Sequence, residues 1–487
     1  MIEEIVTVHD KFSVEIKMGY EARKDRKVNE FSVKTWLFIP SKLDINSSTY
    51  KKEDFYNDFN SNIRLITPPY ALREIAQGEH SVFSYLEDAF TKVSNYTSPK
   101  NEANYEYHIR MFHSILKSAL RREIQHILRN EMAEDRRFLI GEYIENVKAI
   151  TSRYRDLRRI VNVPTMQKEM YDYYLFGDEF MSNQFEQHSY YLHRGLKKMY
   201  AADFEQSKDD ILKLIRDEVA YKRSQGYLVV EKESTDRNRW LVHRRGVFNK
   251  YFEGQLLLSS RKKKEGVFMM QLLYSVAAGL AMIIGAALTL VFQKSLGAFT
   301  IPLYIALVII YMLKDRIKDL SRHYLVGKIN KRFFDHKTII RVKGDEKIGW
   351  CKESFDFVSE DSVPLRVRKH RNRSRIIDIE SRGVGEKIIF YRKLLRLDQK
   401  ALDNSYGKYN ITGVADIIRF NVSRFIQKMD NPEKPLYYLE GDEFENLSGE
   451  KVYFMNMVLR FKLDDETSYR RYRIIFNRRG IKKVEKV

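Results

Sequence analysis

Several residue types are scarce in this 487-residue chain, and each scarcity excludes a class of protein. Cys351 is the only cysteine, so the chain forms no internal disulfide and no site built from several cysteines. The low glycine and proline content (22 and 9 residues) excludes collagen-like and low-complexity architectures. The sequence also lacks HExxH, GxSxG, GxxxxGK[ST], CxxC and protein-kinase signatures. We therefore predict no catalytic, metal or cofactor site.

Apolar residues are plentiful, which excludes a mostly disordered chain. Hydrophobic residues make up 44% of the sequence and aromatic residues 13%. The length corresponds to about three domains at roughly 150 residues each. We expect a folded chain with several parts.

Two runs without any charged residue lie near the middle of the chain. The first covers 28 residues, 266–293, and the second covers 19 residues, 295–313, with Lys294 alone between them. A helix needs about 20 apolar residues to cross a hydrocarbon core of about 30 Å. The runs predict a two-helix transmembrane hairpin within residues 261–320, with spans at about 267–292 and 296–313. Two helices buried in the centre of a large soluble domain are the alternative.

Basic residues flank the two runs and predict their orientation. These juxtamembrane residues are Arg261, Lys262, Lys263, Lys264, Lys314, Arg316 and Lys318. Positive charge next to a membrane span stays on the cytoplasmic side. We therefore expect a cell-membrane protein whose two termini are both cytoplasmic.

Small residues recur at four-residue spacing in the first run, at Ala277, Ala281, Gly285 and Thr289. Such a stripe lets another helix approach closely. The partner helix is either the second helix of the same hairpin or a helix of another copy. Neither run contains an ionisable residue, so transport by a single copy is not expected. A pore built from several copies stays open as an alternative.

The regions on either side of the two runs differ in their predicted secondary structure. Alternating apolar and polar residues predict a small antiparallel sheet within residues 1–45, and helical spacing predicts a mainly helical domain over 46–260. Residues 321–487 are expected to form a smaller α+β domain. Its predicted elements are helices at 386–402 and 413–429 and a terminal β-hairpin formed by 451–462 and 469–477.

The positive charge is concentrated in the C-terminal region. Residues 321–487 contain 37 Lys and Arg against 24 Asp and Glu, within a chain of net charge +20. The densest cluster consists of Arg366, Arg368, Lys369, Arg371, Arg373 and Arg375, the last three at alternate positions of an expected extended segment. Three interpretations remain: contact with anionic lipid headgroups, a solvated or partner-docking surface, and nucleic-acid binding. No helix-turn-helix, zinc-finger or RRM signature supports the third.

These patterns favour a non-enzymatic, membrane-anchored scaffold, adaptor or sensor. Its expected partners are an anionic lipid bilayer and either another protein or further copies of the chain. The alternative is a gated oligomeric effector, in which soluble domains sense a signal and clustered hairpins perturb the bilayer. A membrane-bound enzyme without a recognisable motif is a third class.

Overall fold

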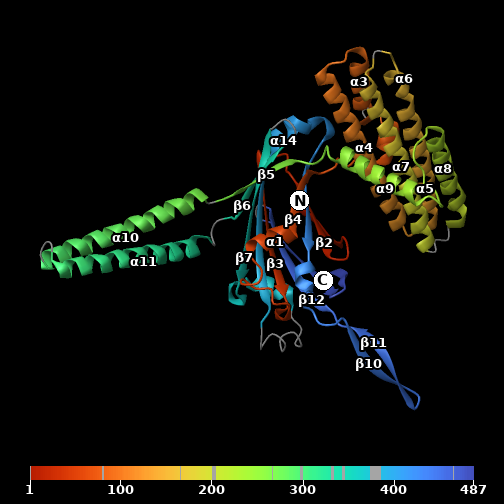
Figure 1. Cartoon of the computed structure of the whole chain (residues 1–487). Helices are drawn as coiled ribbons and strands as arrows, with labels where there is room; N and C mark the ends of the chain where they lie inside the picture. The colour runs from red at the N-terminus through yellow and green to blue at the C-terminus, as the bar shows by residue number, and fades with distance from the viewer. Residues whose placement is uncertain are drawn as a thin grey trace. The chain divides into compact units, whose positions relative to one another are not determined.

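The chain folds into two compact units, one built on β-sheets and the other on helices (Figure 1). The chain as a whole is therefore α+β, as expected. The computed structural model describes residues 2–78, 82–164, 166–199, 204–265, 267–296, 300–330, 334–342, 346–372, 385–463 and 466–487. The β unit comprises Met1–Ile63, Leu258–Ser405 and Gly413–Val487. The helical unit comprises Arg64–Leu257 and Tyr406–Thr412.

Two sheets form the body of the β unit. The four-stranded sheet has the order β1-β2-β9-β4, with β1 at Ile2–Val8, β2 at Ser13–Glu21, β9 at Gly413–Asn421 and β4 at Phe59–Leu65. The eight-stranded sheet has the order β14-β13-β12-β3-β8-β7-β6-β5. Its strands are β14 (Gly480–Lys486), β13 (Glu466–Asn477), β12 (Tyr453–Leu463), β3 (Val28–Ile39), β8 (Lys387–Asp398), β7 (Lys347–Val358), β6 (His336–Arg341) and β5 (Ser259–Lys264).

The two sheets pack face to face and enclose an aromatic core. The Phe59 ring of β4 lies 4.8 Å from the Tyr391 ring of β8, measured between centroids. The Tyr20 ring of β2 lies 5.4 Å from the Phe31 ring of β3. Burial of such large side chains removes apolar surface from water and is the main force that holds the sheets together.

Strands from the two ends of the chain pair with each other. β3 pairs with β8 on one side and with β12 on the other, and β2 pairs with β9. The predicted division into a separate sheet at 1–45 and a separate domain at 321–487 therefore does not describe this unit. Alternation within a strand shows that the strand exists, but it carries no information about a partner 400 residues away.

Two of the predicted C-terminal helices are strands. Residues 386–402 and 413–429 contain β8 and β9, each of which lies in the interior of a sheet. Their apolar runs are short and nearly continuous, and periodicity alone does not distinguish such a run from a buried helix. The terminal hairpin was predicted correctly, since β12 pairs with β13.

The helical unit is a bundle of long helices together with two short ones, α2 (Leu72–Gln77) and α6 (Arg158–Val161). The long helices are α3 (Val82–Asn95), α4 (Pro99–Arg129), α5 (Ala133–Asp156), α7 (Lys168–Lys198), α8 (Phe204–Ser224) and α9 (Thr235–Glu253). At the start of α4, the Ser98 side chain accepts a hydrogen bond from the Asn101 amide and Pro99 occupies the first turn. Sequence alone therefore specifies this helix start.

The interior of the bundle also contains ion pairs along α7. Arg244 of α9 donates two hydrogen bonds of 2.7 Å to the buried Glu179 carboxylate. Lys222 of α8 is completely buried and forms an ion pair with Glu186. Each buried charge has a partner, as the cost of burying an unpaired charge requires.

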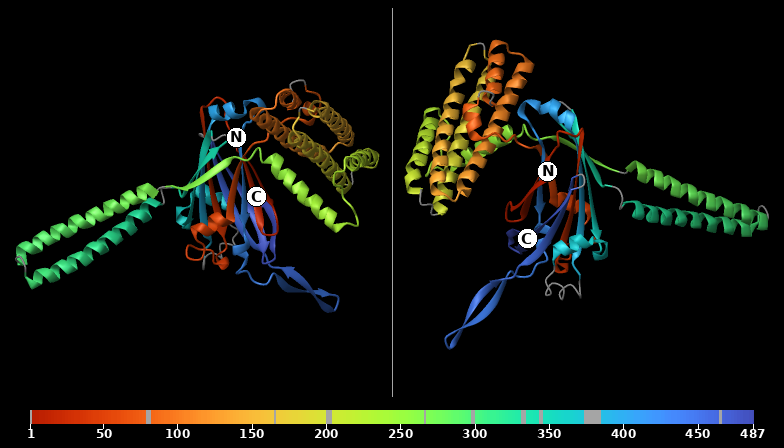
Figure 2. Two further views of the ribbon diagram at one scale, coloured as in Figure 1. Left: turned by 45° about the horizontal axis from the view of Figure 1, so that its top comes forward. Right: turned by 180° about the vertical axis from the view of Figure 1, so that it is seen from behind.

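Smaller elements complete the β unit. They are α1 (Lys52–Asp58), α12 (Leu365–Arg371), α14 (Gln399–Tyr406) and α15 (Ser423–Ile426), and a two-stranded arm formed by β10 (Glu433–Glu440) and β11 (Glu443–Glu450). A helical hairpin, α10 (Val267–Leu296) and α11 (Ile301–Asn330), is inserted between the neighbouring strands β5 and β6. The two helices lie side by side in every view (Figure 2).

Candidate functional site

The small-residue stripe of α10 is the buried side of the helical hairpin. Ala277 and Ala281 are buried, and α11 is the element that packs against α10. A side chain at Gly285 would contact the Lys314 side chain at 3.6 Å, so Gly285 also faces α11. The Thr289 hydroxyl donates to the Gly285 carbonyl at 2.9 Å within α10.

One helix of the described part of the chain is long and apolar enough to cross a membrane. It covers Gln271–Ser295, and only 17% of its most apolar stretch is buried. The predicted second span is not confirmed. Only 13 uncharged residues, 301–313, belong to α11 before Lys314, which corresponds to about 20 Å of helix. The predicted run of 19 residues was longer because it included Ser295 and Leu296, which belong to α10.

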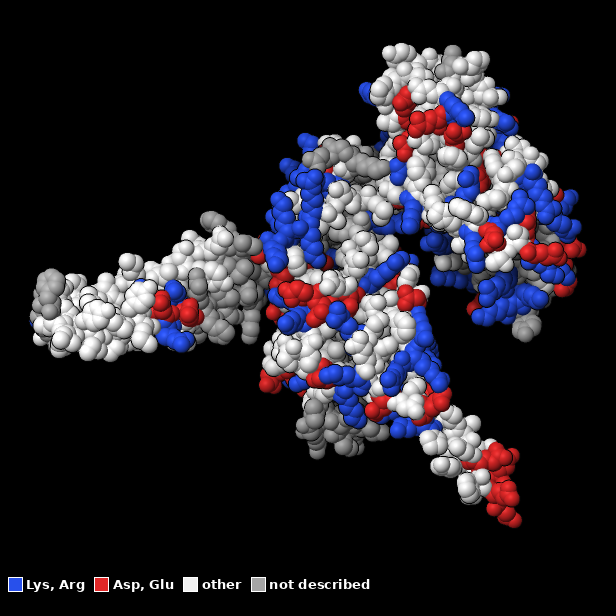
Figure 3. Space-filling view, viewed as in Figure 1, with Lys and Arg blue, Asp and Glu red and all other residues white. Residues whose placement is uncertain are grey.

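The charged part of α11 lies beside the middle of α10. Because Lys314 contacts Gly285, the two residues lie at the same level of the hairpin. Gly285 precedes Lys294 by nine residues of α10, which corresponds to about 14 Å. Lys318 forms an ion pair with Asp315 at 3.0 Å, and Arg316 is exposed. Figure 3 shows blue and red residues together on the hairpin, beside white residues.

The basic residues before the hairpin lie on an edge strand. Arg261, Lys262, Lys263 and Lys264 are all part of β5, whose six residues are exposed and which pairs only with β6. Lys264 is opposite His336, so the two ends of the hairpin meet in one ladder. Lys262 extends over the Tyr56 ring at 4.3 Å and reaches Glu353 at 3.5 Å.

The described residues of the C-terminal basic cluster differ in exposure. Arg366, Arg368 and Lys369 are exposed on α12, whereas Arg371 ends this helix and is 2% exposed. Its guanidinium forms a 2.6 Å ion pair with Glu386. Arg371 therefore belongs to the interior and not to the predicted anionic surface. Arg373 and Arg375 lie outside the described residues.

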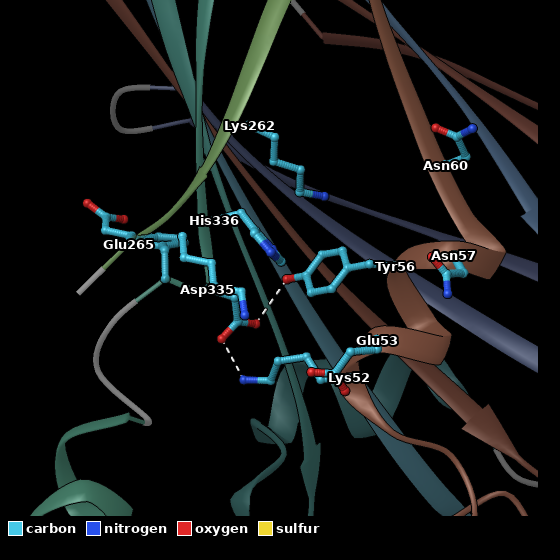
Figure 4. Close-up of a pocket in the computed structure, with 11 residues that line it drawn as sticks. Lys52, Glu53, Tyr56, Asn57, Asn60, Lys262, Glu265, Asp335 and His336 are labelled. Atoms are coloured by element: carbon cyan, nitrogen blue, oxygen red, sulfur yellow. Dashed lines mark hydrogen bonds and ion pairs between the residues drawn. The ribbon is translucent and has the colours of Figure 1, made fainter. Parts of the chain in front are cut away.

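A polar cavity of about 670 Å³ lies where the hairpin joins the eight-stranded sheet (Figure 4). It is lined by α1, by the start of β4, by β5 with the residue after it, and by the residues around the start of β6: Lys52, Glu53, Tyr56, Asn57, Asn60, Lys262, Lys264, Glu265, Phe334, Asp335 and His336. Its size suits a small molecule. We call it the hairpin-base cavity.

Asp335 fixes the geometry of this cavity. Its carboxylate accepts hydrogen bonds from Lys52 at 2.5 Å, from the Tyr56 hydroxyl at 2.9 Å and from the Phe355 amide at 2.8 Å. Its carbonyl accepts from the Glu265 amide at 3.0 Å, just before α10 begins. One residue thus connects α1, β7 and one leg of the hairpin.

His336 forms the aromatic side of the hairpin-base cavity. Its ring lies edge-on to the Tyr56 ring, 4.5 Å between centroids, and its Nδ1 is buried without a hydrogen-bond partner among the described residues. Burial and the neighbouring Lys262 lower the pKa of His336. Burial and Asp335 raise the pKa of Tyr56 far above its ordinary value. Both groups are therefore uncharged at neutral pH.

A network of buried charges lies directly behind the cavity, between the two sheets. The Lys393 ammonium donates to the Asp416 carboxylate, to Ser61 Oγ at 2.8 Å, and lies 3.3 Å from Glu353 Oε1. The Tyr391 hydroxyl also donates to Glu353. Lys262, which contacts Glu353 from the cavity side, connects the network to the solvent.

The ion pairs of this network shift the pKa values of its members. Burial opposes a charge on Lys393, but Asp416 and Glu353 outweigh it and hold the Lys393 pKa well above its usual range. Burial also acts against ionisation of Glu353, yet Lys393 and Lys262 lower its pKa to about 2. Burial raises the pKa of Asp416 although Lys393 and Ser61 oppose the shift. Lys393 and Glu353 therefore remain an ion pair at neutral pH.

The sequence analysis missed this network, although the sequence contains a signal for it. In β8 the residues on the inward face are Ile389, Tyr391, Lys393, Leu395 and Leu397, with one charge among them. In β9 the inward residues are Val414, Asp416, Ile418 and Phe420, again with one charge. One charged residue on the apolar face of a strand indicates a buried partner of opposite sign.

Comparisons with protein families, curated proteins and solved structures find no match to this chain. No group of His, Cys, Asp and Glu among the described residues is arranged to hold a metal ion. Two features of the β unit are the candidates for a functional role: the exposed apolar hairpin and the polar cavity at its base.

Proposed function

We propose that the chain is a membrane-anchored sensor or scaffold whose α10–α11 hairpin inserts into a bilayer. The observation that carries this proposal is the exposure of α10, because a core helix of the same composition would be mostly buried. Exposed large apolar residues follow both helices, from Leu272 to Leu313. Such a surface is costly in water and favourable in a hydrocarbon environment.

The pairing of β5 with β6 supports a topology in which both flanking regions lie on one side of the membrane. A single span through α10 would place these two strands on opposite sides, where they could not pair. The basic residues of β5, together with Lys314 and Arg316 of α11, favour the cytoplasmic side. In this proposal the hairpin makes two spans, and both termini are cytoplasmic.

A second candidate, the gated oligomeric effector, is favoured by the charged band of α11. A bilayer core of about 30 Å would enclose Lys314, Asp315 and Arg316, because Lys314 is only about 14 Å from the level of Lys294. Charges at this depth need water or partners. Several copies that turn their α11 helices toward a common interior would supply both, with α10 facing the lipid.

The β10–β11 arm supports a contact with a second copy of the chain. Six large apolar residues are exposed on this arm: Leu436, Tyr437, Tyr438, Leu439, Phe444 and Leu447. A two-stranded hairpin is marginally stable alone in water. The end of the arm is acidic, with Glu440, Asp442, Glu443 and Glu445 (red in Figure 3), and the chain has a net charge of +20. A second copy therefore offers the complementary charge.

The anchoring proposal is tested by shortening the chain at the hairpin. Because β5 and β6 are antiparallel neighbours and Glu265 lies opposite Asp335, a two-residue Asn-Gly turn can replace residues 266–334 without interrupting the sheet. We expect the parent chain to stay with membranes through an alkaline carbonate wash and the short-turn variant to be soluble and folded. The control for purely electrostatic attachment is the full-length chain with Arg261→Ser and Lys263→Ser. This variant should stay in the membrane. A parent chain that is soluble without detergent would overturn the proposal.

The effector candidate has its own matched pair of variants. A leucine at Gly285 collides with Lys314, whereas Gly279 has open space around it. We expect dye release from vesicles to be lost in Gly285→Leu and kept in Gly279→Leu, with both variants still membrane-bound. Absence of dye release by the parent chain would remove this candidate and leave the anchoring proposal intact.

A further inference from the structure

Three cations occupy adjacent positions on three neighbouring strands of the eight-stranded sheet. Arg460 of β12 is directly opposite Lys34 of β3, and Lys34 is directly opposite Arg392 of β8. Like charges at directly opposed positions of a sheet repel each other. A fold that places three of them in one row therefore requires a compensating anion or full solvation.

Solvation of this row is incomplete, because the three side chains line a cavity of about 340 Å³. All three residues are partly buried. Burial, followed by Arg460 and Arg392, lowers the pKa of Lys34. The Arg460 Nε is buried and has no hydrogen-bond partner among the described residues. The site therefore holds positive charge that its own side chains do not neutralise.

Among the residues that the structure describes, the acidic groups near the row are too few to balance it. Asp356 is the only acidic residue among the described residues that line the cavity, and its carboxylate lies 3.9 Å from the Arg392 guanidinium. Arg392 also donates to Ser354 Oγ at 2.7 Å. No ion pair or hydrogen bond reaches the Lys34 ammonium from the described residues.

The remaining walls of the cavity are aromatic and hydroxylic. The Trp36 and Phe390 rings stack at 4.9 Å between centroids, and α12 with its preceding turn covers them through Val363 and Val367. Ser359 and Ser362 line the cavity at this turn. The cations are thus held on a rigid sheet beside a packed aromatic cluster, which keeps their spacing fixed.

We propose that this cavity binds the phosphate group of a small organic phosphate, held by Lys34, Arg392 and Arg460. Arginine fits phosphate oxygens with paired hydrogen bonds, and lysine contributes a point charge. A cavity of this volume lies at the lower end of the range for small-molecule sites. The same phosphate chemistry occurs in soluble esters such as nucleotides and in lipid headgroups, so the experiment must separate these sources.

The test measures binding of two soluble probes, pyrophosphate and ATP, by calorimetry, and of vesicles containing phosphatidic acid by flotation. We expect Lys34→Gln and Arg460→Gln to weaken binding by about tenfold to a hundredfold. Arg396→Gln is the matched control, because Arg396 lies on β8, the strand of Arg392, is exposed and does not line the cavity. The control should bind like the parent chain.

Two further measurements make the outcome decisive. Asp356→Asn removes the acidic group of the cavity and should tighten binding, a gain that misfolding does not produce. Weaker binding of the soluble probes by Lys34→Gln and Arg460→Gln would identify a soluble ligand. Weaker binding of the vesicles alone would identify a lipid headgroup. Absence of binding to all three probes, or equal losses in Arg396→Gln, would overturn the proposal.

Discussion

Replacement of Lys393 by methionine should destabilise the β unit strongly at neutral pH. Methionine has a similar length but no charge, so Asp416 and Glu353 lose the cation that neutralises them between the two sheets. Both carboxylates are almost completely buried. Removal of one partner from a buried ion pair costs about 3–5 kcal/mol, and we expect Lys393→Met to fall in this range.

The loss should depend on pH in a defined direction. Burial already raises the pKa of Asp416 in the folded chain, and removal of Lys393 raises it further. A carboxyl group whose pKa is raised on folding destabilises the fold above its unfolded value of about 3.9 and regains stability when it is protonated. The stability that Lys393→Met loses should therefore be largest at neutral pH and should shrink as the pH falls toward 4. Lys393→Met combined with Asp416→Asn should recover a large part of the loss.

Tryptophan fluorescence in denaturant provides the assay, because Trp36 and Trp350 belong to the β unit and Trp240 to the helical unit. In a Trp240→Phe background the signal reports the β unit alone, and Trp240 is exposed, so its replacement is mild. Lys262→Met is the control, since Lys262 contacts Glu353 from a half-exposed position and should cost about 1 kcal/mol or less. A Lys393→Met chain as stable as the parent at pH 7, or equally destabilised at pH 4 and pH 7, would refute the reasoning.

Three further predictions concern other parts of the chain. Burial lowers the pKa of His113 to about 3 and the pKa values of His108 and His188 to about 4, so folding of the helical unit disfavours their protonation. Stability should be fully present above pH 6.5 and fall below it by about 1.4 kcal/mol per pH unit for each histidine, and helical melting temperatures that stay constant from pH 7 to 5 would contradict this. Leu439 is 80% exposed on the arm, and Leu439→Ser should lower the mass of the detergent-purified complex without changing stability; an unchanged mass would exclude the arm contact. Burial raises the pKa of the Cys351 thiol, so a thiol reagent should label it only after unfolding, and rapid labelling of the native chain would be inconsistent with the fold.

The parts of the fold that could be predicted are those governed by local patterns. The charge-free run at 266–293 predicted the helix α10, and the alternation in 451–462 and 469–477 predicted the pairing of β12 with β13. Each pattern is complete within a short stretch of sequence. The small-residue stripe is also local, and its residues Ala277 and Ala281 are buried in the hairpin.

The parts that could not be predicted depend on partners distant in sequence. β3 lies between β8 and β12, and only the folded sheet brings Lys34 beside Arg392 and Arg460. In the sequence Lys34 is separated from the two arginines by more than 300 residues, and all three cations look like ordinary surface charges. The second span stays unconfirmed for a related reason, because the length of an uncharged run does not reveal where one helix ends and the next begins.

The position of the hairpin within the sheet limits how a signal could reach it. Both legs leave from one ladder, β5 with β6, and Asp335 holds the point where they meet. The Asp335 carboxylate is shared between Lys52 and Tyr56, and both of these residues line the hairpin-base cavity. A molecule that binds in this cavity competes for the same hydrogen bonds and so acts directly on the base of the hairpin. A sensor that works through the hairpin therefore needs no long-range pathway within the β unit, because Glu265 lines the cavity and lies two residues before α10.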